Sequence, residues 1–224
     1  MIVWLQRLLE PAEVDQVVAA MRAARMRSGK ATAGILARDA KENEELDPAS
    51  LDKAALDAVV SAALARNRTF ESAARPARMI PFLYSRYVPG SRYGSHLDNA
   101  VMKAHGDPVR VDLSLTIFLS DPKTYDGGEL SVDTEYGTKA FKLPPGDAAL
   151  YPTLYYHEVK PVTRGERLAC ITWIQSLVRD PQRRQMLYDM AVLAEWMHAQ
   201  HPGSPQFRQF NKIQWNLYRM WADD

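Results

Sequence analysis

The chain has 224 residues, of which 46% are hydrophobic and 25% charged, and its formal net charge is +1. This length suits one substantial domain with additions, and the near-neutral charge excludes the strong basic field of a nucleic-acid or anionic-membrane binder. The single cysteine, Cys170, cannot build a disulfide framework, and no stretch approaches the roughly 20 apolar residues of a membrane span. Since the opening MIVWLQRLLEP lacks the basic leader of a signal peptide, we expect a cytoplasmic protein without nucleic-acid or membrane partners.

Residues 1–75 are expected to be mostly helical. Apolar residues recur at helical spacing in EPAEVDQVVAAMRAARM and again in DPASLDKAALDAVVSAALAR. The second segment opens on Asp47 and Pro48, which predict an N-cap followed by proline at the first helical position. The Gly- and Ala-rich SGKATAG lies between the two segments.

Residues 76–179 are expected to form a β domain. Short β-type runs separated by turn signals follow one another here: RMIPFLYSRYVPGSRYG, VDLSLTIFLS, GELSVDT, TKAFKLPPGDAALYP, YYHEVKPV and RLACITWIQSLV. This spacing predicts an antiparallel sandwich or barrel and places Cys170 in its core. The fold class is therefore α+β, mainly β.

Residues 180–224 are expected to be helical again. One apolar row after Asp180-Pro181 is predicted to face the core: Met186, Leu187, Met190, Leu193 and Met197. FNKIQWNLYRMW predicts a further short helix. These helical flanks could cover the barrel, build a homo-oligomer or gate its mouth.

A metal site is predicted around His96 and Asp98, which one leucine separates in RYGSHLDNAV. Side chains at i and i+2 of a strand share a face, so an imidazole and a carboxylate would converge inside the sheet. These are two members of the facial triad that holds non-haem Fe(II) with open coordination positions. His157, in LYYHEVKPV, is the candidate for the third ligand.

The remaining histidines are weaker candidates. His105 and Asp107 repeat the H-x-D spacing, but Gly106 between them and Pro108 after them favour a turn. His198 and His201 flank the end of the C-terminal helical segment, where a solvated role is expected.

Arg167 lies ten residues after His157, at the start of an apolar strand. A guanidinium entering a core is costly unless an anion pairs with it, and a small dicarboxylate beside the metal would fit. Arg164 is the competing cation, placed in the VTRGE turn and expected to be solvated. The alternative interpretation makes His157 an ordinary core histidine and Arg167 a surface ion pair, but it does not explain the ordered set.

That ordered set resembles Fe(II)/2-oxoglutarate-dependent dioxygenases on the double-stranded β-helix (jelly-roll) fold. At closer range YGSHLDNAVM, VDLSLTIFLSDPKTYDGGELSV, LPPGDAALYP and HEVKPVTRGERLACITWIQSLVRD resemble the bacterial PKHD-type hydroxylases, relatives of prolyl 4-hydroxylase, over essentially the whole chain. The resemblance implies that His96, Asp98 and His157 ligate Fe(II) and that Arg167 pairs with the distal carboxylate of 2-oxoglutarate.

The resemblance also implies a tyrosine that hydrogen-bonds the cosubstrate. Tyr87, nine residues before His96, matches that position, while Tyr84 and Tyr93 lie close enough to serve instead. Thr172 and Trp173 are expected near the pocket, with Trp173 on the Arg167 face of the strand.

The implied reaction hydroxylates an unidentified small molecule or protein with O2 and releases succinate and CO2, with ascorbate as a further expected reductant by analogy. DGGE at residues 126–129 is interpreted as a structural turn. The alternatives are a cupin-like metal-dependent isomerase, which would have no reason to bury Arg167, and a non-catalytic metal- or ligand-binding jelly roll.

Overall fold

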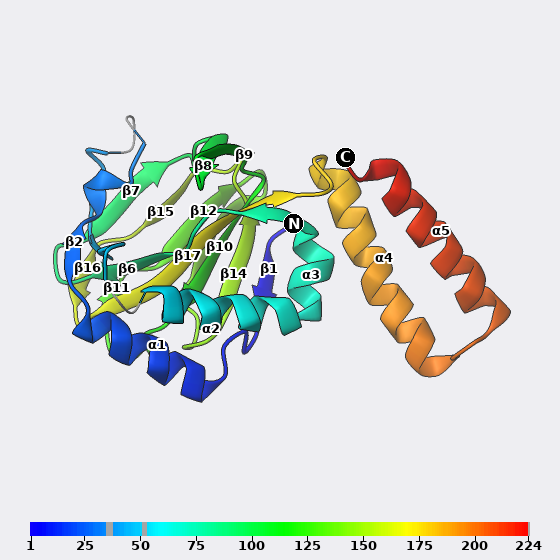
Figure 1. Ribbon diagram of the computed structural model, residues 1–224, viewed down its shortest axis with the longest axis horizontal. Coiled ribbons are helices and arrows are strands. Elements are labelled where there is room, and N and C mark those ends of the chain that lie inside the picture. The colour runs from blue at the N-terminus through cyan, green and yellow to red at the C-terminus, as the bar shows by residue number, and fades with distance from the viewer. Residues whose placement is uncertain (35–37, 51–52, 224) are drawn as a thin grey trace.

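The computed structural model describes residues 1–34, 38–50 and 53–223. Its centre is formed by two antiparallel sheets (Figure 1). The larger sheet has the strand order β1 (Val3–Leu5), β14 (Ala148–Pro152), β10 (Leu113–Phe118), β17 (Arg167–Ser176), β6 (Leu83–Tyr87), β4 (Glu44–Leu46) and β2 (Met26–Ser28), and β5 (Pro76–Met79) also pairs with β17. The smaller sheet has the order β13 (Gly137–Phe141), β12 (Leu130–Thr134), β15 (His157–Val159), β7 (Arg92–His96) and β3 (Lys41–Glu42).

Two short ribbons and the helices complete the fold. β8 (Val101–Ala104) pairs with β9 (Asp107–Arg110), and β11 (Asp126–Gly127) pairs with β16 (Val162–Arg164). The helical elements are α1 (Pro11–Ala23), η1 (Gly29–Ala31), α2 (Lys53–Arg66), α3 (Arg68–Ala74), α4 (Pro181–Gln200) and α5 (Pro205–Trp221). No helix in the part of the chain that the structure describes is long and apolar enough to cross a membrane.

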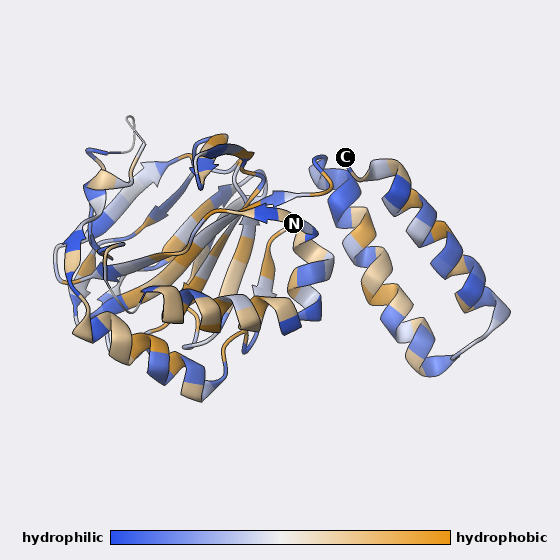
Figure 2. Ribbon diagram, in the orientation of Figure 1, coloured by the Kyte–Doolittle hydropathy of each residue, from blue (hydrophilic) through white to orange (hydrophobic). Residues whose placement is uncertain are grey.

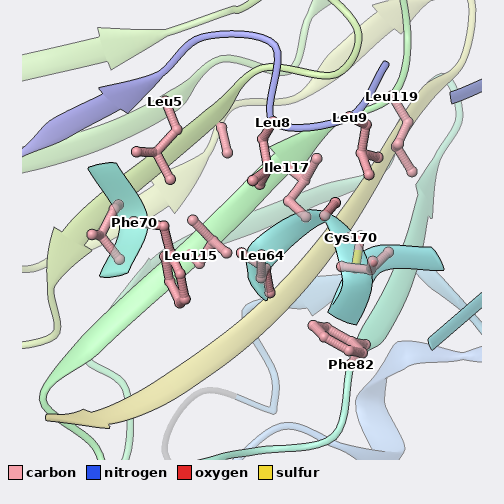
Figure 3. Close-up of a cluster of buried hydrophobic side chains, with 14 of the residues drawn as sticks. Leu5, Leu8, Leu9, Leu64, Phe70, Phe82, Leu115, Ile117, Leu119 and Cys170 are labelled. Atoms are coloured by element: carbon pink, nitrogen blue, oxygen red, sulfur yellow. The ribbon is translucent and has the colours of Figure 1, made fainter. Parts of the chain in front are cut away.

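The main hydrophobic core lies between the larger sheet and α1–α3. Side chains from both layers meet there, including Leu64 and Phe70 from the helices and Leu115, Ile117 and Cys170 from the strands (Figure 3). Figure 2 shows hydrophobic residues concentrated along the central strands of this sheet. Each fully buried leucine or phenylalanine stabilises the fold by about 1.5–3 kcal/mol, so this layer holds the larger sheet in a fixed position.

A second apolar cluster lies between the two sheets. Phe118 and Tyr151 of the larger sheet pack there against Leu130 and Val132 of the smaller sheet. The faces of the two sheets therefore enclose an interior, which is the jelly-roll arrangement expected from the sequence.

The N-terminal segment differs from its expectation. α1 forms where the apolar spacing predicted it, but residues 1–50 also contribute β1, β2 and β4 to the larger sheet and β3 to the smaller one. The predicted helix start at Asp47 and Pro48 is wrong, because the Asp47 carboxylate accepts a hydrogen bond from the backbone N–H of Ala49 in a turn and α2 begins at Lys53. Leu51, assigned to this helix, lies outside the described residues.

The C-terminal prediction is confirmed for its helices and wrong for their apolar row. Asp180 caps α4 by accepting from the N–H groups of Gln182 and Arg183, and α5 follows as an antiparallel partner (Figure 1). Of the row expected to face the core, Leu187 is buried, but Met186 and Leu193 are 53% and 44% exposed. The reason is that α4 packs on α3 and on α5, at one end of the molecule and away from the sheets.

Candidate active site

The structure brings together the three predicted metal ligands. His96 ends β7, His157 begins β15, and the two residues are register partners across these strands. Asp98 lies two residues beyond the end of β7, so the expectation that it shares the strand with His96 is wrong in that detail. One donor atom from each side chain lies within 4.8 Å of the other two, and the His157 Nε2 and Asp98 Oδ2 atoms are 3.6 Å apart.

Both histidines are oriented through their backbone surroundings. Nδ1 of His96 lies 2.8 Å from the Gly94 carbonyl oxygen, and Nδ1 of His157 lies 3.2 Å from the Tyr155 carbonyl oxygen. A carbonyl only accepts, so Nδ1 carries the proton in each ring and donates it. The Nε2 lone pairs are therefore left for a metal ion.

Burial tunes the protonation of the ligands. It lowers the pKa of His96 to about 3, which keeps the imidazole neutral and able to coordinate. Burial also raises the pKa of Asp98, while His157 and the indole of Trp173 oppose that rise. The Asp98 Oδ2 atom is buried and finds no hydrogen-bond partner within the described residues, so a cation is the natural partner for its charge.

Arg167 is the second buried group that lacks a partner. The residue is 1% exposed, and its Nε and Nη1 atoms find no hydrogen-bond acceptor within the described parts of the chain. Its guanidinium lies over the rings of Tyr87 and Phe118, at 4.9 and 5.5 Å from their centroids. An unpaired buried cation is costly, so an anionic ligand is expected at this place.

The structure separates the candidate tyrosines. Tyr87 is the register partner of Arg167 and lies beside it inside the core, where burial raises its pKa to about 12. Tyr84 points to the opposite face and donates to the Asp57 carboxylate of α2 at 3.0 Å. Tyr93 stacks on His96 with ring centroids 3.6 Å apart. Of the three, Tyr87 is the one beside the buried guanidinium.

Trp173 and Thr172 occupy opposite faces of β17, as strand alternation predicts. The Thr172 hydroxyl donates to the Ile80 carbonyl oxygen at 2.6 Å, away from the metal ligands. Trp173 lies on the Arg167 side, close enough to Asp98 for its indole N–H to lower the pKa of that carboxyl group.

A buried ion pair beside the triad was not predicted. Lys41 of β3 pairs with Glu45 of β4, and the Thr32 hydroxyl lies at 2.8 Å from the Glu45 carboxylate. The Lys41 ammonium also lies 5.0 Å from the ring centroid of Tyr93, on whose ring His96 stacks. Because Lys41 and Glu45 neutralise each other, the charges of Asp98 and Arg167 remain available to ligands.

The other sequence candidates lie outside this cluster. His105 is exposed at positive φ in the β8–β9 turn, and His198 and His201 are exposed at the end of α4. Arg164 is exposed and pairs with Asp126 at 2.7 Å, so it is the solvated arginine of the two. The structure thus separates His105 and Arg164 from the predicted site residues that they resemble.

The donor set fits the cofactors implied by the sequence resemblance. Two imidazoles and one carboxylate are the ligands of a facial Fe(II) site, and one donor atom of each side chain lies within 4.8 Å of the other two. The buried guanidinium of Arg167, with two nitrogen atoms unpaired within the described residues, is chemically complementary to a carboxylate.

A jelly roll with this donor set defines the class of Fe(II)- and 2-oxoglutarate-dependent oxygenases, and the sequence profile described as the 2OG-Fe(II) oxygenase superfamily matches residues 82–175. A PKHD-type hydroxylase of Xanthomonas euvesicatoria pv. vesicatoria is 42% identical over 220 residues, covering 96% of each chain. A PKHD-type hydroxylase of a Synechococcus strain is 40% identical over 223 residues, covering 100% of each chain. The chain belongs to the PKHD-type hydroxylase family, and it is a hydroxylase that uses Fe(II) and 2-oxoglutarate.

Solved structures confirm the fold. A prolyl-4-hydroxylase of Pseudomonas putida superposes with a TM-score of 0.54 at 19% identity, covering 78% of this chain and 92% of that one. A prolyl hydroxylase of Trichoplax adhaerens superposes with a TM-score of 0.57 at 13% identity, covering 83% of this chain and 86% of that one. At these identities the likeness supports the jelly-roll fold alone.

Proposed function

We propose that this chain hydroxylates its substrate at a site in which His96, Asp98 and His157 hold Fe(II). Arg167 and Tyr87 hold the distal carboxylate of 2-oxoglutarate. The proposal is carried by three buried atoms that find no hydrogen-bond partner within the described residues: Asp98 Oδ2, Arg167 Nε and Arg167 Nη1. Each of these two side chains therefore needs an ion of opposite charge. With both cofactors bound, one atom of O2 enters a substrate C–H bond while the other oxidises 2-oxoglutarate to succinate and CO2.

The protein residues bind and orient. The backbone carbonyls of Gly94 and Tyr155 fix the histidine tautomers, and stacking against Tyr93 fixes the plane of the His96 ring. The apolar and aromatic residues between the sheets exclude water from the reacting centre. In this proposal the triad would hold the metal ion and Arg167 would hold the carboxylate, in a site largely shielded from water.

Succinate formation tests the assignment. Purified protein supplied with Fe(II), O2 and 2-oxoglutarate is expected to form succinate slowly even before a substrate is identified. Asp98→Ala and His157→Ala are expected to abolish this turnover, whereas the matched control His105→Ala, at an exposed turn, is expected to retain it. Succinate formation that survives in both triad variants, with the fold verified by circular dichroism, would remove the triad assignment. A cupin-like isomerase or a binding module would form no succinate in any variant.

The proposal extends to the partners of the enzyme and to its location in the cell. We propose a cytoplasmic enzyme that acts with O2 on a small-molecule or protein substrate, without nucleic acid or membrane, and with ascorbate as the reductant that keeps the iron ferrous. The proposed homo-oligomer is supported by exposed apolar residues on α4 and α5, among them Met186, Trp196 and Met220. Sedimentation velocity of the wild-type protein and of Trp196→Asp tests this, because a monomer in both would contradict it.

A further inference from the structure

Tyr125 is a buried tyrosine without a partner for its hydroxyl group. The residue is 1% exposed, and its hydroxyl oxygen makes no hydrogen bond within the residues that the structure describes. Buried tyrosine hydroxyl groups usually find a partner, because an unsatisfied one costs free energy. The sequence pattern did not point to this tyrosine as a candidate for the site.

The turn after Tyr125 packs the tyrosine ring against Arg167. Gly128 has a φ of +68°, and a Cβ built on it would lie 3.0 Å from the Arg167 Cδ atom and 3.1 Å from the Tyr125 Cε2 atom. Both side chains therefore lie over the same glycine. Burial raises the pKa of Tyr125, and the nearby Arg167 guanidinium opposes that rise.

Lys142 also contacts the Tyr125 ring. The Lys142 ammonium lies 4.3 Å from the Tyr125 ring centroid and donates a hydrogen bond to the Tyr125 carbonyl oxygen at 2.9 Å. Lys142 and the Gly128 turn beside Arg167 therefore both restrict the position of the Tyr125 side chain. A ring held in this way presents its hydroxyl group in a defined position.

An unpaired phenol next to an unpaired guanidinium matches a carboxylate. Arg167 leaves Nε and Nη1 without acceptors, and Tyr125 leaves its hydroxyl proton without one, within the described chain. A carboxylate has two oxygens with about four lone-pair positions, enough to accept from both side chains at once. One ligand group therefore resolves both deficits.

We infer that the Tyr125 hydroxyl group donates a hydrogen bond to the distal carboxylate of 2-oxoglutarate, together with Arg167. The inference rests on the proposed function of the site and adds a binding residue to it. The Arg167 guanidinium lies over the ring of Tyr87, and Tyr125 lies beside the Gly128 turn. In this inference the carboxylate site therefore contains two tyrosines from separate parts of the chain.

The test compares two ligands that differ only in the distal group. 2-Oxopentanoate has the keto acid end of 2-oxoglutarate but a methyl group in place of the distal carboxylate. Calorimetric titration of each ligand into anaerobic Fe(II) protein gives its Kd. Tyr125→Phe is expected to weaken 2-oxoglutarate about tenfold or more, the scale of a hydrogen bond to a charged group, and to leave 2-oxopentanoate unchanged.

Tyr84→Phe is the matched control, since this buried hydroxyl group bonds Asp57 on the opposite face of β6. It is expected to change neither Kd. Without ligand, the Tm of Tyr125→Phe is expected to be no lower than that of wild type, because the lost hydroxyl group has no partner within the described residues. 2-Oxoglutarate is expected to raise the Tm of this variant by less than it raises that of wild type.

The outcomes separate this inference from the proposed function. A Kd for 2-oxoglutarate in Tyr125→Phe within twofold of wild type overturns the inference, and so does an equal weakening of both ligands, which would indicate a packing role. If Arg167→Met still weakens 2-oxoglutarate in those cases, the proposed function stands. If wild-type protein does not bind 2-oxoglutarate at all, the proposed function fails first.

Discussion

Replacement of Arg167 by methionine should weaken 2-oxoglutarate binding without lowering the stability of the ligand-free protein. The guanidinium is buried, and its Nε and Nη1 atoms bond no acceptor within the described residues, so it is an uncompensated charge in the absence of ligand. Removing one member of a buried charge pair typically costs about 2–5 kcal/mol. Because about 1.4 kcal/mol corresponds to a factor of ten, the Kd for 2-oxoglutarate should increase by a factor between about 30 and several thousand.

The stability of the ligand-free protein should not fall in the same variant. Methionine is apolar and of similar length, so Arg167→Met removes the desolvation cost of the charge while it keeps the packing against Tyr87 and Phe118. Chemical denaturation in the absence of cofactors measures this, and titration of 2-oxoglutarate into anaerobic Fe(II) protein measures affinity. Arg164→Met is the control, because Arg164 is exposed and pairs with Asp126. A larger loss of affinity in Arg164→Met than in Arg167→Met would refute the choice of arginine.

Further predictions concern the turn, an ion pair and the cysteine. Gly128→Ala should lower stability and weaken 2-oxoglutarate binding, because alanine is strained at a φ of +68° and its Cβ would press on Arg167 from 3.0 Å; unchanged denaturation and titration curves would contradict this. A hydrogen bond from Arg66 lowers the pKa of Glu13 below 4.5, so Glu13→Gln should reduce the free energy of unfolding by about 0.5 kcal/mol at pH 7. The difference between variant and wild type should vanish as the pH falls through the lowered pKa of Glu13. A difference that persists at pH 3 in urea denaturation would be inconsistent with this ion pair. Burial raises the pKa of the Cys170 thiol, so native protein should not react with a disulfide reagent at pH 8 until denaturant is added, and rapid native labelling would disprove the burial.

The clustering of the candidate metal ligands could be predicted because the sequence signal combines their chemistry with strand pairing. The H-x-D spacing near a strand end limits where His96 and Asp98 can point, and a distal histidine on an apolar strand completes a set that few other functions need. The second H-x-D pair, His105 and Asp107, could be distinguished from the first because a glycine lies between its members. Gly106 adopts a positive φ, which is typical of a turn and not of a strand. The burial of Arg167 could be predicted because a charged residue opens a mainly apolar strand.

The strands β3 and β4 could not be predicted because their inward face is polar. Lys41, Asn43 and Glu45 alternate toward the interior, where all three are buried, while Glu42 is exposed and Glu44 half-buried. Hydrophobic periodicity assigns such a segment to solvent, and only the pairing of β3 with β7 and β4 with β6 places it at the site. Tyr125 was missed for a related reason, since nothing in its neighbours indicates that a turn folds it against Arg167.

The exposed apolar row of α4 shows a different limit. Its spacing is that of a helix packed on a core, but within the described residues neither sheet covers it, and α5 covers only part of it. Helical periodicity reports that a helix has an apolar face and does not report what covers that face. A partner outside the chain produces the same pattern as an internal core.

The central claim is that one buried site holds Fe(II) through His96, Asp98 and His157 and 2-oxoglutarate through Arg167. Anaerobic titration of 2-oxoglutarate into the Fe(II) protein, followed by visible absorption, tests it most directly, because chelation of the metal by the keto acid produces a weak metal-to-ligand charge-transfer band. We predict that the band appears in wild type, is lost in Asp98→Ala and persists in His105→Ala. Iron binding without the band, or a band that survives in Asp98→Ala, would contradict the account.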